Sequence, residues 1–93
     1  MAISFSQRIT IAPDVLFQLV GDEGVLLNLR TELYLGLDAV GTRMWTALNQ
    51  APCIQAAYDS LLQEYDVEPN RLRQDLEDLV RRLLEQSVIE TPA

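Results

Sequence analysis

The chain has 93 residues, 48% of them hydrophobic, and a formal net charge of −7. This length favours one domain, residues 1–93, without room for separate cofactor and substrate halves, and the hydrophobic content argues against disorder. All seven basic residues are arginines, and from Cys53 onward four arginines stand against nine acids. Such a surface repels phosphates, so we expect no nucleic acid among the partners.

The sequence carries no sign of a membrane or export signal. No apolar run approaches the ~18 residues that span a bilayer, and residues 1–7 lack the pattern of a signal peptide. The single cysteine, Cys53, allows no internal disulfide. We therefore expect a cytoplasmic protein without a membrane partner.

Three strand-like segments occupy the first part of the chain, after Ile9 and Ile11, which alternate with polar neighbours. Residues 15–20 and 25–30 are apolar and rich in β-formers, with a turn predicted at 21–24 from its glycines and acids. Residues 33–37 form a third such segment. Because the links are short, we predict an antiparallel meander.

Strand alternation assigns the side chains of these segments to faces. One face of the second strand carries Val25, Leu27 and Leu29, and the other carries Asn28 and Arg30. In the third strand, Leu33, Leu35 and Leu37 share one face. Tyr34 points the other way, and either packs on a helix or contacts a bound chain.

The period of the pattern changes at Asp38, whose carboxylate suits a helix N-cap. A first helix follows and ends at residues 50–52; its apolar face is Val40, Met44, Trp45 and Leu48. A second helix is marked by Ile54, Ala57, Leu61, Leu62 and Tyr65. Strands followed by helices predict an α+β domain.

The third predicted helix starts at Pro69, a residue suited to the first helical position. It has one wide apolar face, formed by Leu72, Leu76, Leu79, Val80, Leu83 and Leu84. The pair Val88 and Ile89 then returns to the core, which completes an order of three strands and three helices.

The residues for common catalytic chemistry are missing. Without histidine and with one cysteine, neither a nucleophile–histidine pair nor a Cys/His zinc site can be built. The acids Asp75, Glu77 and Asp78 fit a solvated helix face better than a catalytic pair. Cys53 fits a helix start better than a reactive thiol. We expect no enzyme activity and no cofactor.

Several pieces in order resemble the signature of the PqqD family. They are Val25-Leu26-Leu27-Asn28-Leu29, Tyr34-Leu35-Gly36-Leu37-Asp38, Gly41-Thr42-Arg43-Met44-Trp45, Leu61, Tyr65-Asp66-Val67, Asp75-Leu76, Leu79 and Val88-Ile89. The resemblance runs from about Val15 to Glu90. The chain departs from the family pattern in the loop at residues 49–52, at Cys53 and at Ser87, which weakens the subfamily assignment more than the fold.

The resemblance implies a three-stranded antiparallel sheet with three helices, similar to a winged helix-turn-helix. It also implies a recognition element that binds the leader of a ribosomally made precursor peptide. The leader is added as a strand to the third strand, beside the third helix. A separate leader peptidase, as in lasso-peptide pathways, or another maturation enzyme then acts on the precursor. One pattern favours the lasso type over a chaperone of the pyrroloquinoline-quinone pathway, which works beside a radical enzyme. It is Leu37-Asp38-x-x-Gly41-x-x-Met44-Trp45.

This interpretation selects the residues that bind the peptide. On the third strand they are Leu33, Tyr34 and Leu35. On the third helix they are Leu72, Leu76, Leu79 and Leu83 as an apolar floor, with Asp75 and Arg82 on the polar margin. The margin of Arg73 and Glu77 is the alternative. Glu32, just before the strand edge, discourages self-pairing, so we predict a monomer.

Two other classes of function compete with peptide recognition. A winged-helix DNA reader needs a basic helix, but no arginine or lysine lies between Cys53 and Tyr65. A structural or regulatory subunit without a peptide ligand remains the other alternative.

Overall fold

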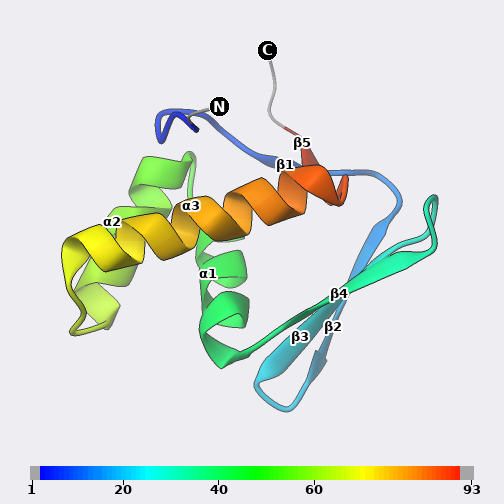
Figure 1. Cartoon of the computed structure of the whole chain (residues 1–93), viewed down its shortest axis with the longest axis horizontal. Coiled ribbons are helices and arrows are strands. Elements are labelled where there is room, and N and C mark those ends of the chain that lie inside the picture. The colour runs from blue at the N-terminus through cyan, green and yellow to red at the C-terminus, as the bar shows by residue number, and fades with distance from the viewer. Residues whose placement is uncertain (1–2, 91–93) are drawn as a thin grey trace.

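The computed structural model describes residues 3–90 (Figure 1). Its elements are, in chain order, β1 (Thr10–Ile11), β2 (Val15–Val20), β3 (Glu23–Asn28), β4 (Leu33–Leu37), α1 (Ala39–Gln50), α2 (Ile54–Glu64), α3 (Pro69–Glu85) and β5 (Ile89–Glu90). The predicted α+β order of three strands and then three helices is confirmed.

The main sheet has the order β2-β3-β4, and both pairs are antiparallel. The turn between β2 and β3 is tighter than the predicted residues 21–24. Gly21 adopts a φ of 68°, a left-handed conformation that favours glycine. Strand β3 already begins at Glu23, so Gly24 lies inside the sheet, opposite Leu19 on β2 and Leu37 on β4.

The inner face of the sheet belongs to the alternate set of β3 residues that contains Asn28. Leu26 is completely buried, in a row with Phe17 and Leu35, and Asn28 is 3% exposed. The more apolar set, with Val25 and Leu27, faces outward. Hydrophobicity alone therefore misleads here, because the sheet buries an amide whose hydrogen bonds are all made inside the protein.

Asn28 connects the β3–β4 turn to the end of α3. Its Nδ2 donates to the carbonyls of Gln86 at 3.3 Å and Ser87 at 3.2 Å. Its Oδ1 accepts from the backbone N–H groups of Arg30 at 3.0 Å and Thr31 at 3.3 Å. The side chain thus fixes the position of the β3–β4 hairpin relative to the C-terminus of α3.

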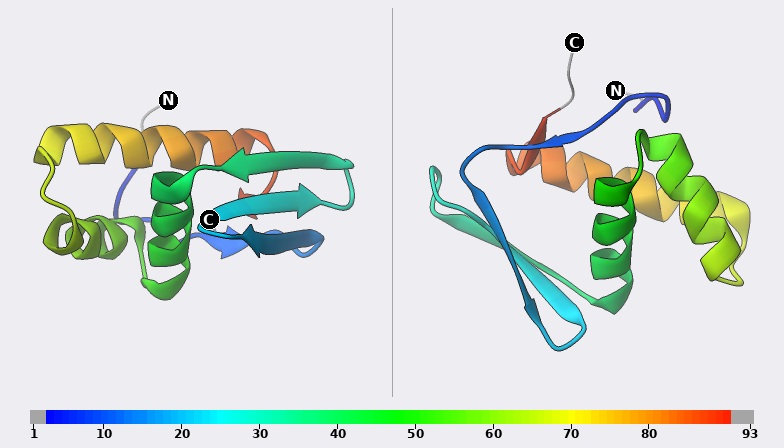
Figure 2. Two further views of the ribbon diagram at one scale, coloured as in Figure 1. Left: turned by 90° about the horizontal axis from the view of Figure 1, so that it is seen from below. Right: turned by 180° about the vertical axis from the view of Figure 1, so that it is seen from behind.

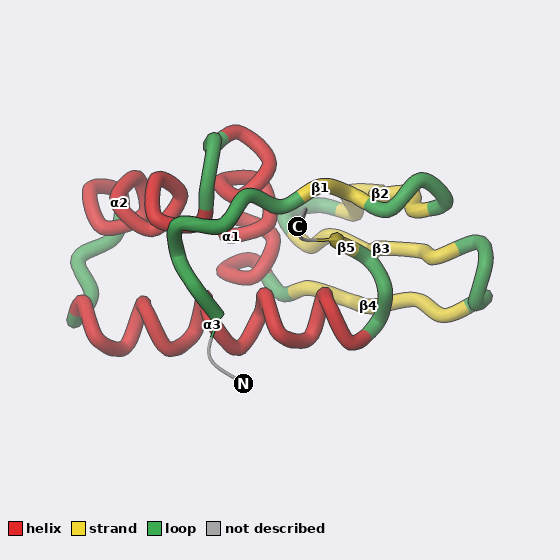
Figure 3. The backbone as a smooth tube through the Cα atoms, turned by 90° about the horizontal axis from the view of Figure 1, so that it is seen from above, coloured by secondary structure: helices red, strands yellow, loops and turns green. Residues whose placement is uncertain are grey.

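The helices begin as the sequence predicts. Asp38 caps α1 by accepting a bond from the N–H of Gly41 at 2.7 Å, and Pro69 opens α3 after the N-cap Glu68. Two opposite views show α3 along one side of the molecule, with β4 as the nearest strand of the main sheet (Figures 2 and 3). The fully buried core side chains include Leu26, Ile54, Leu61, Leu76, Val80 and Leu83.

A small second sheet pairs β1 with β5, which the sequence did not predict as strands. It brings Val88 and Ile89 into the core, each 2% exposed, as expected. The N-terminal segment then supports α2, because the N–H groups of Ile54 and Gln55 donate to the carbonyls of Gln7 and Phe5. In the part of the chain that the structure describes, no helix has the length and apolarity to cross a membrane.

Candidate functional site

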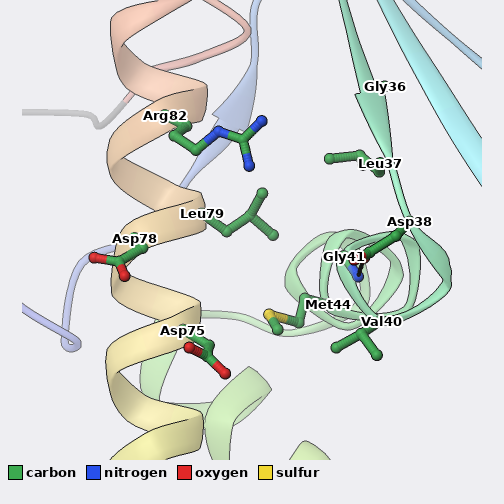
Figure 4. Close-up of a pocket in the computed structure, with 10 residues that line it drawn as sticks. All are labelled: Gly36, Leu37, Asp38, Val40, Gly41, Met44, Asp75, Asp78, Leu79 and Arg82. Atoms are coloured by element: carbon green, nitrogen blue, oxygen red, sulfur yellow. Dashed lines mark hydrogen bonds between the residues drawn. The ribbon is translucent and has the colours of Figure 1, made fainter.

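A groove of about 480 Å³ separates α3 from the end of β4 and the start of α1 (Figure 4). Asp75, Asp78, Leu79 and Arg82 of α3 line it on one side. The other side is formed by Gly36, Leu37, Asp38, Val40, Gly41 and Met44. Strand β4 and helix α1, which follow one another in the sequence, and the more distant helix α3 therefore build this site.

The α3 wall presents two charges and one apolar side chain to the groove. Asp75, Leu79 and Arg82 point toward α1 and β4, whereas Asp78 points away from them (Figure 4). Asp78 accepts a bond from Gln74 at 2.9 Å and lies 3.6 Å from the Arg81 guanidinium. Within residues 3–90, Arg82 forms no ion pair, so its guanidinium faces the groove without a carboxylate partner.

The α1 wall is apolar next to the helix N-terminus. Met44 is 5% exposed and forms the base of this wall. Val40, expected to pack with Met44, Trp45 and Leu48, is instead 48% exposed at the groove. The first turn of α1 projects past the core, which explains why its periodicity alone overstates the burial of Val40.

The groove continues into a smaller apolar hollow of about 100 Å³ near the start of α3. Val40, Met44 and Asp75 line both spaces, so the two form one continuous surface. The other residues of this hollow are Tyr65, Val67, Arg71 and Leu72. We call this hollow the anchor pocket.

The free edge of β4 runs beside the groove. Strand β4 pairs with β3 on one side, and among residues 3–90 no strand pairs with its other side. Its backbone N–H and C=O groups on that side are therefore available to another extended chain.

The structure brings together only part of the predicted site. Asp75, Leu79 and Arg82 line the groove, and Leu72 lines the anchor pocket. Leu76 and Leu83 are completely buried in the core and line neither space. Leu33, Tyr34 and Leu35 lie on β4, but the groove is lined by the two residues after them, Gly36 and Leu37.

The sequence also gave no reason to place Val40, Gly41 and Met44 opposite α3. The N-cap motif at Asp38, the apolar periodicity of Val40 and Met44 and the family resemblance at Gly41 and Met44 locate the first helix without showing what faces it. The candidate site is therefore larger than predicted on its α1 side.

The outer face of the sheet is a second apolar surface. A hollow of about 350 Å³ on it is lined by Leu16, Gln18, Val20, Val25, Leu27 and Tyr34, none of which is charged. Tyr34 is 75% exposed and Val20 65%. Tyr34 therefore packs on no helix, and its contact with a bound chain stays a prediction. We call this surface the outer sheet face.

Nothing in the described part of the chain resembles a metal centre. No group of three potential ligands among His, Cys, Asp and Glu gathers within residues 3–90. Cys53 is half-buried at the N-cap of α2. The chemistry that this site offers is recognition through backbone groups, apolar contacts and charge.

Comparison with known proteins agrees with this geometry. The family model described as "Coenzyme PQQ synthesis protein D (PqqD)" matches residues 23–89. Curated protein sequences give no match. A solved structure described as "TbiB1 in Complex with the TbiA(beta) Leader Peptide" is similar, with 36% identity and a TM-score of 0.80 over 89% of this chain and 96% of that one. Because the family model spans β3 to β5, the chain belongs to the PqqD family.

Proposed function

We propose that this chain binds the leader of a ribosomally made precursor peptide and holds it for processing. The free edge of β4 beside a groove walled by α3 carries the proposal. Support also comes from TbiB1, which shares the fold and whose structure is described as a complex with a leader peptide. The role is recognition and not catalysis.

The leader binds as a fourth strand. An extended peptide beside Leu33–Leu37 continues the antiparallel sheet, and its side chains alternate between the groove and the outer sheet face. Each backbone hydrogen bond contributes only ~0.5–1.5 kcal/mol net. Ordering a flexible peptide offsets part of this gain, so apolar side chains must also enter the groove, at ~25 cal/mol per Å² buried.

A separate enzyme processes the bound precursor in this proposal. The sequence resemblance favours a leader peptidase of the lasso type. The outer sheet face is its docking surface, because an added leader strand would extend that face and place leader side chains next to Tyr34. An enzyme seated there contacts the recognition element and its bound substrate together.

This docking surface is tested by exchanging one exposed apolar residue for a charge. Val20→Glu on the outer sheet face should leave leader affinity within about twofold and slow leader removal by the maturation enzyme at least ~10-fold. Glu32→Gln, a change in the exposed β3–β4 turn, is the control. Unchanged leader removal with Val20→Glu contradicts docking on this face.

Leader binding itself is tested by fluorescence polarisation. The probes are the labelled TbiA(beta) leader and the leader encoded by a precursor gene beside this chain's gene, each with a scrambled version. Saturable 1:1 binding of one leader, but not of its scrambled version, is expected. If no leader binds above the level of its scrambled version, the proposed function is wrong.

A further inference from the structure

Among the arginines of the helical region that the structure describes, Arg82 differs because its guanidinium forms no ion pair and no aromatic contact. Arg43 pairs with Glu64 at 2.7 Å and Arg81 with Glu77 at 3.0 Å. Arg73 lies 4.0 Å above the centre of the Phe5 ring. Arg82 has no such partner within residues 3–90, and it projects into the groove toward β4 (Figure 4).

A peptide in the groove would cover this guanidinium and remove water from it. Covering a charge without a partner is costly, whereas a carboxylate on the peptide restores the lost solvation as an ion pair. A lysine or arginine at the same place would add repulsion. The position facing Arg82 therefore selects an acidic side chain, although the whole chain is itself acidic.

The anchor pocket selects the opposite kind of side chain. Val40, Met44, Tyr65, Val67 and Leu72 supply most of its surface, and Leu72 is only 5% exposed. An apolar or aromatic side chain of the peptide fits there and gains from burial. The site thus has one apolar end and one cationic end.

The geometry of α3 gives the spacing between the two selected side chains. Leu72 and Arg82 are ten residues apart on one helix, which is about 15 Å at ~1.5 Å per residue. An extended peptide covers this length in about four to five residues at ~3.3 Å each. Because only alternate side chains of a strand face the groove, a separation of four is the one that fits.

We infer that the groove recognises leaders by an apolar anchor followed four residues later by an aspartate or glutamate. This inference rests on the proposed function and adds the chemistry of the peptide. The order assumes an antiparallel leader strand, the commoner and slightly more stable pairing. Such a strand passes the Leu37 end of β4 before the Leu33 end. The anchor pocket lies on the Leu37 side, because Val40, three residues after Leu37, lines it, so the acid comes after the anchor.

Asp75 adds a third selective position between the two ends. It lines both the groove and the anchor pocket, and its 3.9 Å approach to Arg71 is a weak, exposed pair. A peptide side chain that faces α3 midway between anchor and acid would meet this carboxylate. Acidic residues are therefore excluded at that middle position.

Selection from a displayed library of random ten-residue peptides tests the inference. The protein should enrich peptides with an apolar or aromatic residue at position i and Asp or Glu at i+4, with acids depleted at i+2. For an enriched peptide, replacing the i+4 acid by lysine should weaken binding at least about fivefold, the upper range for exposed ion pairs. The difference should shrink as salt is raised.

Charge reversal in the protein provides the matched test. With Arg82→Glu, the lysine peptide should bind better than the acidic one, and selection should enrich Lys or Arg at i+4. Arg8→Glu changes the net charge equally at an exposed residue that lines neither space, and should keep the acidic preference. With Asp75→Asn, the depletion of acids at i+2 should disappear.

The outcomes separate this inference from the proposed function. Enrichment of an apolar anchor without any charge preference at i+4 overturns the inference and leaves peptide binding intact. An acid enriched on the N-terminal side of the anchor contradicts the stated order. Failure to enrich any peptide overturns the proposed function as well.

Discussion

Asn28 connects the β3–β4 turn to the C-terminal end of α3, the two elements that stand on either side of the sheet–helix boundary. It is 3% exposed and makes four hydrogen bonds, two as donor to the end of α3 and two as acceptor in the β3–β4 turn. From the sequence, this residue looked like the polar face of a strand. The structure makes it the joint between the sheet and α3.

Replacing Asn28 by aspartate should show how much its hydrogen bonds contribute to the free energy of unfolding. Asn28→Asp keeps the acceptor oxygen but removes both donated bonds and places a carboxylate against two carbonyls, so the free energy of unfolding should fall by about 2–3 kcal/mol. Urea unfolding measures the change. Asn70→Asp, the same exchange at an exposed residue of α3, should stay within about 0.5 kcal/mol. If the Asn28→Asp protein is as stable as the wild type, the hydrogen bonds that Asn28 donates do not stabilise the fold, contrary to this prediction.

The two margins of α3 offer a second test at the residue scale. Asp75→Ala and Arg82→Ala should each weaken leader binding several-fold, because both side chains line the groove. Arg73→Ala and Glu77→Ala remove a ring contact and an ion pair away from it, so leader affinity should not change. Polarisation titrations compare the four variants. The reverse pattern would place the leader on the opposite margin.

The sequence allowed the site residues on α3 to be predicted, but not those on α1. Helical periodicity alone puts Asp75, Leu79 and Arg82 on one side, because 3.6 residues per turn fix which side chains share a face. The same rule wrongly predicted that Leu76 and Leu83 contact the peptide. Both lie on that side of the helix, but they are completely buried and do not line the groove. Val40 and Met44 needed tertiary information, since no local pattern tells which helix faces α3.

At the scale of elements, the sequence predicted the strands of the main sheet and all three helices. It missed the β1–β5 pair, because two-residue strands carry no periodicity and their partners lie at opposite ends of the chain. It also placed the start of β3 two residues late, at Val25. The cause is Gly24, which resembles a turn residue but serves a packing role.

Gly24 belongs in the sheet because Phe17 packs over it. A Cβ at position 24 would collide with the Phe17 ring, whose centroid lies 5.8 Å from that of Trp45. The N–H of Gly24 also donates to Thr42 Oγ1 at 2.8 Å, which ties β3 to α1. The glycine thus permits the contact between the sheet and the first helix.

Gly24→Ala should therefore destabilise the protein by about 1–3 kcal/mol through overpacking. Gly36→Ala is the matched control, because no atom lies within 4 Å of the Cβ it would add. Thermal unfolding followed by circular dichroism compares the two variants. Equal melting temperatures would mean that Phe17 moves aside freely, contrary to this account of the β3–α1 contact.

At the scale of the whole molecule, we predict a monomer that takes one leader. The edge strand β4 has only five residues, and Glu32 just before it discourages pairing with a second copy. Light scattering coupled to size exclusion should give the monomer mass over a wide concentration range, and a 1:1 complex after leader is added. A dimer that persists on dilution would contradict the prediction.

The architecture suits the proposed recognition of a peptide by a chain of this size. The core fixes α3 and the sheet, Asn28 joins them at one end, and Thr42 joins the sheet to α1. What remains between them is a groove with a strand edge along it. An extended peptide would fit this arrangement, because its backbone can pair with the strand edge while its side chains enter the groove.

Methylation of leader backbone amides, one position at a time, tests strand addition to β4 most directly. N-methylation removes a donor without changing a side chain, so it should weaken binding at alternate positions, those whose N–H groups face β4. Replacing the apolar anchor by alanine should cost more, about 2 kcal/mol or above, which is roughly 30-fold. Polarisation titrations measure both series. If methylation is harmless at every position, the leader does not join β4 as a strand.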